Sequence, residues 1–342
     1  MRKRVFLCVA TVVALLAVDR SEVSAQTFEA VGVRAQGMAG AFVAVADDAT
    51  SSWWNPAGLA TGAYLTAVLE HGRTVEPDTP IVGRAAQRAT FNDFAIGFPA
   101  LGLSYYRLRI SEMAGSDTTA AWAANRQDPR VGGTSVRSVA MSQFGTTIGQ
   151  SLGDHLVVGS TIKLLMAGAV ISAASGDPDP DLDAADALDV SRHFRSDLDL
   201  GAMANFGHVR LGLTVKNLTE PTFGTGDDAL TLARQARVGL AILSVPNGVL
   251  KGWTVAADAD LTTQNTVMGD VRHIAAGAEG WLANGRLGVR GGVSGNTVDD
   301  LRPAASGGVS VAVTRAIHLN ASRTQGRDKS VRGWNASVSM TF

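Results

Sequence analysis

The sequence predicts an all-β protein: a transmembrane antiparallel β-barrel of about 14 strands with a plug formed by its N-terminal segment. Three observations support this fold class. Strand-like stretches follow one another from residue 63 to residue 342, several of them alternate apolar and polar residues, and their connections are alternately short and long. Bacterial outer-membrane barrels combine an even number of antiparallel strands with short turns at one end and long loops at the other.

Alternation with period two is clearest in residues 209–216, where one face is apolar and the other polar. The apolar face holds Val209, Leu211, Leu213 and Val215, and the polar face holds Arg210, Thr214 and Lys216. In a barrel, the first face suits lipid and the second a polar lumen. The same pattern recurs at 197–206, 253–261, 286–293 and 334–342, whereas 91–98 and 136–152 are less regular and their registers stay open.

A soluble β-sandwich also has alternating strands, so the connections must separate the two folds. Seven long loops and six tight turns alternate without interruption, as expected when both termini lie on the periplasmic side and the long loops face outward. The tight turns lie near 99–100, 153–154, 207–208, 246–248, 284–285 and 315, and the long loops span 73–90, 112–134, 167–194, 219–234, 263–270, 295–302 and 325–331.

Residues 1–25 have the features of a cleavable secretory signal peptide. Residues 2–4 are basic, residues 5–18 are apolar, and residues 23–25 (Val-Ser-Ala) form a small-residue cleavage site. The apolar run of about 14 residues is shorter than the roughly 20 that a spanning helix needs. We therefore expect export and insertion into the cell outer membrane, with outer-membrane lipid around the barrel.

Composition narrows the remaining classes. Lys and Arg number 30 against 31 Asp and Glu, a balance that does not favour nucleic acid as a partner. The single cysteine, Cys8, lies in the signal peptide, so the mature chain is expected to have no thiol or disulfide chemistry. No stretch after residue 25 has 18 consecutive apolar residues, which argues against a helical membrane protein and allows spanning strands of about 10 residues.

The segment before the barrel differs from the strands. Residues 26–62 are rich in Ala and Gly, and the barrel is expected to occupy residues 63–342. Asp47-Asp48 is a helix-start or turn signal, and Pro56 forces Asn55 away from helical angles before the strands begin. Small residues permit close packing in a confined space, which suits a plug inside the barrel better than a wall strand.

Two stretches of this segment resemble the N-terminal hatch of FadL-like outer-membrane proteins. They are Gly37 to Asp48 (Gly-Met-Ala-Gly-Ala-Phe-Val-Ala-Val-Ala-Asp-Asp) and Trp54 to Leu59 (Trp-Asn-Pro-Ala-Gly-Leu). Within that superfamily the chain most resembles the PorV/PorQ-type branch, named for components of a bacterial secretion system. The resemblance implies a 14-stranded barrel with a hatch in its lumen and, in the fatty-acid branch, diffusion of hydrophobic molecules through a wall opening beside the hatch.

Two groups of candidate site residues follow. Ligand or hatch candidates are Phe42, Asp47, Asp48, Trp53, Trp54, Asn55, Pro56 and Ala57, although the motif can also serve only to fix the fold of the plug. Candidates for ion pairs in the lumen are Arg210, Lys216, Asp258, Glu279 and Arg290. Charges of mixed sign in a narrow lumen are costly unless paired, so we expect a polar, obstructed lumen and not an open pore.

No catalytic residue, metal site or cofactor is expected. The acidic stretch 177–189 lacks the Gly and Glu of a calcium loop, whose places hold Leu182 and Leu188, so a solvated acidic surface loop is the better interpretation. Residues 149–153 match a nucleophile elbow in letters only, because a turn and another strand follow where that motif needs a helix.

Two functions remain open. The first is a non-enzymatic barrel that binds small hydrophobic molecules and passes them through a hatch-plugged lumen or a wall opening. The alternative is a PorV/PorQ-type membrane platform whose long loops bind exported proteins or secretion-system partners. A transporter needs a continuous apolar pocket that reaches the hatch near Phe42 and Trp53, whereas a platform needs a dry, filled barrel. An outer-membrane enzyme ranks third, and a soluble exported β-protein is the remaining possibility.

Overall fold

The computed structural model describes residues 31–76, 85–115, 134–244, 252–327 and 331–342. The predicted signal peptide, the first residues of the predicted plug and the predicted turn at 246–248 lie outside these ranges. Within them, none of the helices has the length and apolar character needed to cross a membrane.

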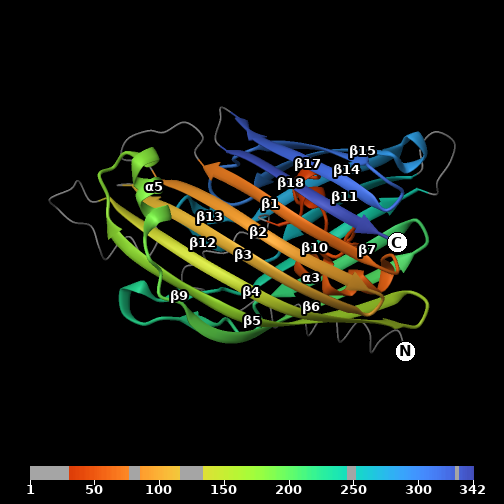
Figure 1. The fold of residues 1–342 in the computed structure, drawn as a ribbon, viewed down its shortest axis with the longest axis horizontal. Helices are drawn as coiled ribbons and strands as arrows, with labels where there is room; N and C mark the ends of the chain where they lie inside the picture. Colours follow the sequence, from red (N-terminus) through yellow and green to blue (C-terminus); the bar gives the residue numbers. More distant parts are fainter. Residues whose placement is uncertain (1–30, 77–84, 116–133, 245–251, 328–330) are drawn as a thin grey trace.

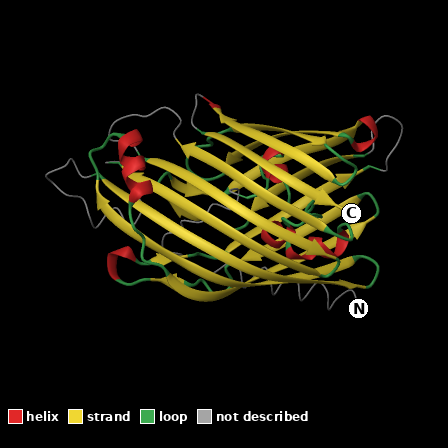
Figure 2. Cartoon of the chain, viewed as in Figure 1, coloured by secondary structure: helices red, strands yellow, loops and turns green. Residues whose placement is uncertain are grey.

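Fourteen antiparallel strands close a barrel, and each pairs with the next along the chain until the last pairs with the first (Figure 1 and Figure 2). The fold class predicted from the sequence is therefore confirmed. The barrel strands are β1 (Thr66–Glu76), β2 (Ala86–Phe98), β3 (Leu101–Ala114), β4 (Ser135–Leu152), β5 (Leu156–Ala173), β6 (His193–Phe206), β7 (Val209–Lys216), β10 (Gln235–Leu243), β11 (Trp253–Asp260), β14 (His273–Leu282), β15 (Leu287–Asn296), β16 (Ala304–Ala312), β17 (Ile317–Gly326) and β18 (Arg332–Thr341).

Short elements fill the connections at the long-loop end. They are α5 (Pro178–Ala187), β8 (Thr222–Phe223), η3 (Gly226–Asp228), β9 (Leu230–Thr231), β12 (Gln264–Thr266) and β13 (Gly269–Val271), while η4 (Ala283–Gly285) forms a tight turn. Short and longer connections alternate as predicted, apart from the one between β10 and β11, where the predicted tight turn lies outside the described residues. The wall is uneven, because β4 and β5 are 18 residues long each, and β5 takes up residues 167–173, which the sequence pattern assigned to a loop.

Apolar side chains face outward on the barrel. Leu211 and Val255 are 46% exposed and Val289 is 40% exposed, as are many other large apolar residues on all sides of the wall. A sandwich would bury these side chains between its sheets, so the soluble alternative is wrong for this chain. Apolar exposure on this scale is unusual for a soluble monomer and suits a hydrocarbon environment.

Residues 31–62 lie inside the barrel and are called the lumenal segment here (Figure 1). The segment contains α2 (Val33–Gly37), α3 (Ser51–Trp54) and η2 (Pro56–Thr61). Carboxylates from two separate walls hold its backbone: Glu70 on β1 accepts from the Gly32 N–H at 2.9 Å, and Asp258 on β11 accepts from the Phe42 N–H at 2.8 Å. Because β1 and β11 both hold the segment, it lies within the lumen between them.

Lumen-facing glycines let the lumenal segment approach the wall closely. A Cβ at Gly159 would lie 2.3 Å from the carbonyl carbon of Pro56, and a Cβ at Gly277 would lie 2.5 Å from the carbonyl oxygen of Met38. Neither distance is possible for real atoms, so the wall must lack side chains at this level. The glycines that meet the segment in this way, called the glycine ring, are Gly159, Gly201, Gly212, Gly239, Gly277 and Gly292.

Candidate ligand site in the barrel lumen

Asn55 forms hydrogen bonds within the lumenal segment and to the barrel wall. Its Nδ2 donates to the carbonyl oxygens of Val43 at 2.9 Å and of Ala202 on β6 at 3.2 Å, and its Oδ1 accepts from the Ala57 N–H at 3.1 Å. Pro56, which follows, begins η2 with a nitrogen that has no hydrogen to satisfy. The residues predicted from the Trp-Asn-Pro-Ala motif thus form one buried joint.

Arg34 is the centre of an ion-pair network beside this joint. Its guanidinium lies 2.5 Å from Asp47, 3.2 Å from Asp48 and 2.7 Å from Glu279 on β14, and Glu279 also pairs with Arg290 at 2.6 Å. Burial alone lowers the pKa of Arg34, but the three carboxylates outweigh it and hold that pKa well above its ordinary value. Arg34 therefore stays charged, and four of the predicted residues meet around it.

The structure places two other predicted lumen charges against uncharged partners. Asp258 accepts from the backbone N–H groups of Phe42 at 2.8 Å and Val43 at 2.7 Å, which anchors the turn after α2. Arg210 Nε donates to Asn205 Oδ1 at 2.7 Å. These side chains position the lumenal segment and the neighbouring wall.

Aromatic side chains lie on the side of the lumenal segment that faces the long-loop end. The Trp53 ring meets the Tyr106 ring edge-on with centroids 4.9 Å apart, and the Tyr106 hydroxyl lies 2.7 Å from Ser52 Oγ. Lys216 Nζ lies 3.2 Å from the centre of the Trp53 ring, a close cation–π contact. Trp54, also fully buried, packs edge-on against Phe42 at 5.8 Å.

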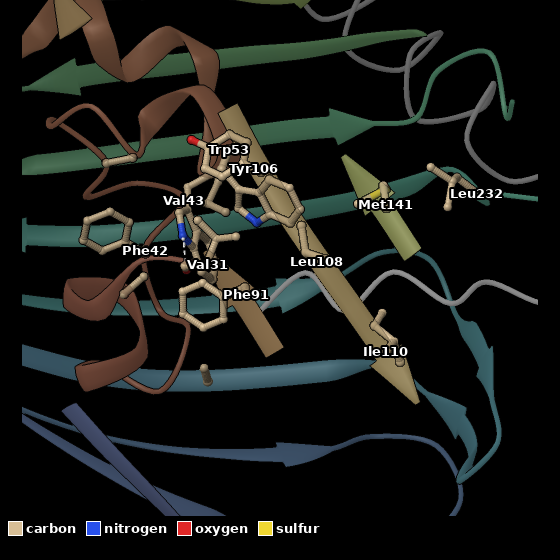
Figure 3. Close-up of a cluster of buried hydrophobic side chains, with 14 of the residues drawn as sticks. Val31, Phe42, Val43, Trp53, Phe91, Tyr106, Leu108, Ile110, Met141 and Leu232 are labelled. Atoms are coloured by element: carbon tan, nitrogen blue, oxygen red, sulfur yellow. Dashed lines mark hydrogen bonds between the residues drawn. The ribbon is translucent and has the colours of Figure 1, made fainter. Parts of the chain in front are cut away.

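On the long-loop side of Tyr106 the inner face of β2 to β5 carries an apolar patch, as Figure 3 shows for several of its side chains. Nearer the long-loop end the same face holds the buried pair Glu112 and Arg137, 3.6 Å apart. The apolar patch, called the apolar wall, consists of Phe91, Leu108, Ile110, Val139, Met141, Leu165 and Ala167, each at most 4% exposed. The expectation of a uniformly polar lumen is therefore wrong on this side. The physical reason is that apolar residues lie on both faces along parts of these strands, as with Leu103 and Leu108 on β3, which is also why 91–98 and 136–152 lack a clean period.

The apolar wall is continuous with the connection between β7 and β10. Phe223, Leu230 and Leu232 from that connection are at most 1% exposed and belong to the same contiguous cluster as Trp53 and Leu108. Figure 3 shows Leu108 and Ile110 along one strand, between the lumenal segment and Leu232. One contiguous cluster of buried apolar side chains thus extends from the connection between β7 and β10 to Phe42, Trp53 and Trp54.

Charged side chains next to the apolar wall and across the lumen are paired with one another. Lys163 on β5 lies 2.8 Å from Asp197 and 2.7 Å from Asp199 on β6, and it donates to Asn217 Oδ1 at 2.7 Å. Arg237 pairs with Asp260 at 2.6 Å. Because these charges satisfy one another, they do not compete for the apolar wall, and the lumen has one side suited to apolar ligands.

The acidic stretch after Gly176 is a helix, so the expectation of a solvated loop is wrong. Asp183 and Asp186 on α5 lie 2.6 Å and 2.8 Å from Arg88 on β2, and a proline at the first position of α5 begins the helix. In the parts of the chain that the structure describes, no group of three or more His, Cys, Asp or Glu could hold a metal ion.

Comparisons with known proteins agree on the fold. Three solved structures superpose well: the Ralstonia pickettii toluene transporter TbuX (TM-score 0.59, 14% identity, 92% of this chain and 99% of that one), the CymD monoaromatic hydrocarbon channel (0.58, 12%, 93% and 99%) and a Pseudomonas aeruginosa FadL homologue (0.57, 11%, 94% and 99%). Residues 130–260 match the family model described as F plasmid transfer operon, TraF, protein. No curated protein matches significantly. The chain therefore shares the barrel fold of these transporters and channels.

Proposed function

We propose that this protein is an outer-membrane barrel of the FadL type that binds small hydrophobic molecules and lets them pass without energy input. The observation on which this rests is the apolar wall, which forms one contiguous apolar cluster with the connection between β7 and β10 and reaches Phe42, Trp53 and Trp54 of the lumenal segment. The shared fold with a toluene transporter and a monoaromatic hydrocarbon channel supports it. Export would use residues 1–25 as a signal peptide, and the lumenal segment would act as the hatch.

Apolar burial supplies the binding energy in this proposal, and no covalent step is needed. Removing apolar surface from water yields about 25 cal/mol per Å², so an aromatic molecule that buries on the order of 200 Å² gains about 5 kcal/mol before the cost of association. After the cost of association is subtracted, the molecule binds weakly. Weak binding suits a molecule that must also be released. The hatch would set the exit, with Phe42, Trp53 and Trp54 at the end of the apolar path.

Binding of a neutral hydrocarbon to two matched variants tests the proposal. Leu108→Asn places an amide in the apolar wall, whereas Leu301→Asn makes the same change at a loop residue that is 61% exposed. We expect toluene affinity to fall at least tenfold in Leu108→Asn and to stay unchanged in Leu301→Asn, with both variants folded by heat-modifiable mobility in gels. Equal affinity in the two variants would show that the apolar wall is not the binding surface.

A membrane platform of the PorV/PorQ type is the second candidate, favoured by the attachment of α5 to the barrel at the long-loop end. There α5 is fixed to the barrel through Arg88, and Arg109 donates to the carbonyl oxygen of Leu188 at 2.5 Å. A helix held on the barrel in this way suits contact with an exported protein. Mild detergent extraction followed by mass spectrometry distinguishes the two, because a transporter retains small apolar molecules and a platform retains a stable protein partner.

A further inference from the structure

The outward charges of the barrel lie on one side only. Within the strands that the structure describes, every outward-facing arginine belongs to β17, β18, β1, β2 or β3, and no strand of the barrel places Asp or Glu on its outward face. The six arginines are Arg73, Arg88, Arg107, Arg109, Arg323 and Arg332. These positive charges gather on one side of a surface that is otherwise apolar. Such a patch is expected to bind an anionic group.

Strand register aligns these charges into a level band near the long-loop end. Arg323, Trp334, Arg73, Thr90 and Arg109 are successive register partners across β17, β18, β1, β2 and β3. Neighbouring strands are about 4.8 Å apart, so the three arginines of this row repeat at about 10 Å. The row is called the basic row here.

The members of the basic row differ in their availability. Arg73 and Arg323 are exposed, and among the described residues neither has a hydrogen bond or ion pair. Arg107, one register step below, is exposed in the same way. Arg109 is partly engaged by Leu188 and Ser138, and Arg88 is taken by α5. Arg73, Arg107 and Arg323 are thus the groups able to meet an external anion.

A groove of about 860 Å³ lies directly below the basic row on the same strands. One side is an apolar register row formed by Leu319, Val338, Leu69, Phe94 and Tyr105, and the other is the row that includes Ala336, His71, Asn92 and Arg107. The residues between these rows, such as Glu70 and Asp93, face the lumen, so the backbone closes the groove. The groove is thus an outer-surface feature, apolar below and basic above.

We infer that this face binds one outer-leaflet glycolipid of lipid A chemistry, with its phosphates on Arg73, Arg107 and Arg323 and an acyl chain in the groove. The inference rests on the proposed outer-membrane location, in which the long-loop end faces the outside. Charge complementarity selects the occupant: Arg guanidinium groups bind phosphate by charge-assisted hydrogen bonds. From the membrane centre outward, the face presents the apolar row, then the groove, then the basic row. This order matches that of an acyl chain followed by a phosphorylated head group.

Native mass spectrometry of the full-length protein with purified lipid A tests the inference. The variant Arg73→Gln/Arg323→Gln removes two charges from the basic row, and Arg286→Gln/Arg315→Gln removes two exposed arginines from the tight-turn end. We expect the lipid A-bound fraction to fall at least tenfold in the first double variant and to stay unchanged in the second. Lipid A without phosphates should bind wild type as weakly as intact lipid A binds the first variant.

A second variant and a second lipid complete the design. Ala336→Trp fills the groove without changing charge, and we expect it to weaken lipid A binding at least fivefold. Equal lipid A binding by both double variants, or phosphatidylglycerol binding as tight as lipid A, would overturn the inference. Toluene binding, measured on the same samples, separates this inference from the proposed function: the basic-row variant should leave toluene affinity unchanged, and a chain that binds no toluene can still show arginine-dependent lipid A binding.

Discussion

Gly159 shows at the residue scale how the lumenal segment is seated. The backbone of Pro56 occupies the space that any side chain at this position would need. Gly201 and Gly212 have the same role toward Asn55 and Val43. The missing side chains of these wall glycines therefore leave the space that the backbone of the lumenal segment fills. They determine the position of the segment along the barrel axis.

We expect Gly159→Ala to destabilise the protein by about 1–3 kcal/mol, because the added Cβ forces the segment or β5 to shift. Gly291→Ala is the matched control: a Cβ there meets nothing closer than the Ser306 carbonyl oxygen at 3.9 Å. Denaturant unfolding in detergent measures both. An unchanged midpoint for Gly159→Ala would show that the segment is loosely held.

Glu279 links the lumenal segment to the wall through Arg34 and to its neighbouring strand through Arg290. Removing its charge leaves the buried Arg290 guanidinium without this carboxylate and Arg34 with only Asp47 and Asp48. We expect Glu279→Gln to cost about 3–5 kcal/mol, as breaking a buried pair from one side does.

Glu220→Gln is the control for this change, because Glu220 pairs with Arg234 where both side chains are about a quarter exposed, and such pairs contribute about 0–1 kcal/mol. The same unfolding measurement compares the two. Similar losses in both variants would contradict the anchoring role of Glu279.

Among the elements, α5 combines a local helix signal with a tertiary anchor. Arg88→Gln removes the cation that holds Asp183 and Asp186. We expect faster protease cleavage within residues 174–192 and little change in the unfolding midpoint of the barrel, since the anchor lies on the outer surface. Limited proteolysis with mass spectrometry of the fragments checks this, and unchanged cleavage would show that apolar contacts such as Leu182 suffice to hold the helix.

The elements also show what sequence could and could not predict. Alternation gave the correct faces where one face is apolar and the other polar, as in residues 209–216. It could not give the inner face of β2 to β5, where Leu108 and Leu103 are both apolar yet face opposite sides. The helix α5 was hidden because proline and aspartate also signal loops, although Asp177 followed by Pro178 is a regular helix start.

At the scale of the whole molecule, the even strand number and the loop rhythm determined the barrel, because closure leaves few other arrangements for such a chain. The glycine ring and the basic row were not predictable in the same way. Both arise from the register that brings residues of different strands to one level, and in the basic row this aligns Arg323 with Arg73 across β18. Charges were assigned to the lumen from alternation alone, which missed those at the outer ends of five strands.

The passage of hydrophobic molecules along the apolar wall is the central claim, and uptake of radiolabelled toluene at nanomolar concentration tests it most directly. The initial rate is compared for cells with wild type, with Ile110→Asp/Val139→Asp, and without the protein. We predict faster uptake with wild type than without the protein, and a rate at least fivefold lower in the variant at equal surface abundance, because two carboxylates interrupt the apolar surface. A variant rate equal to wild type, or a wild-type rate equal to that of cells lacking the protein, would contradict the account.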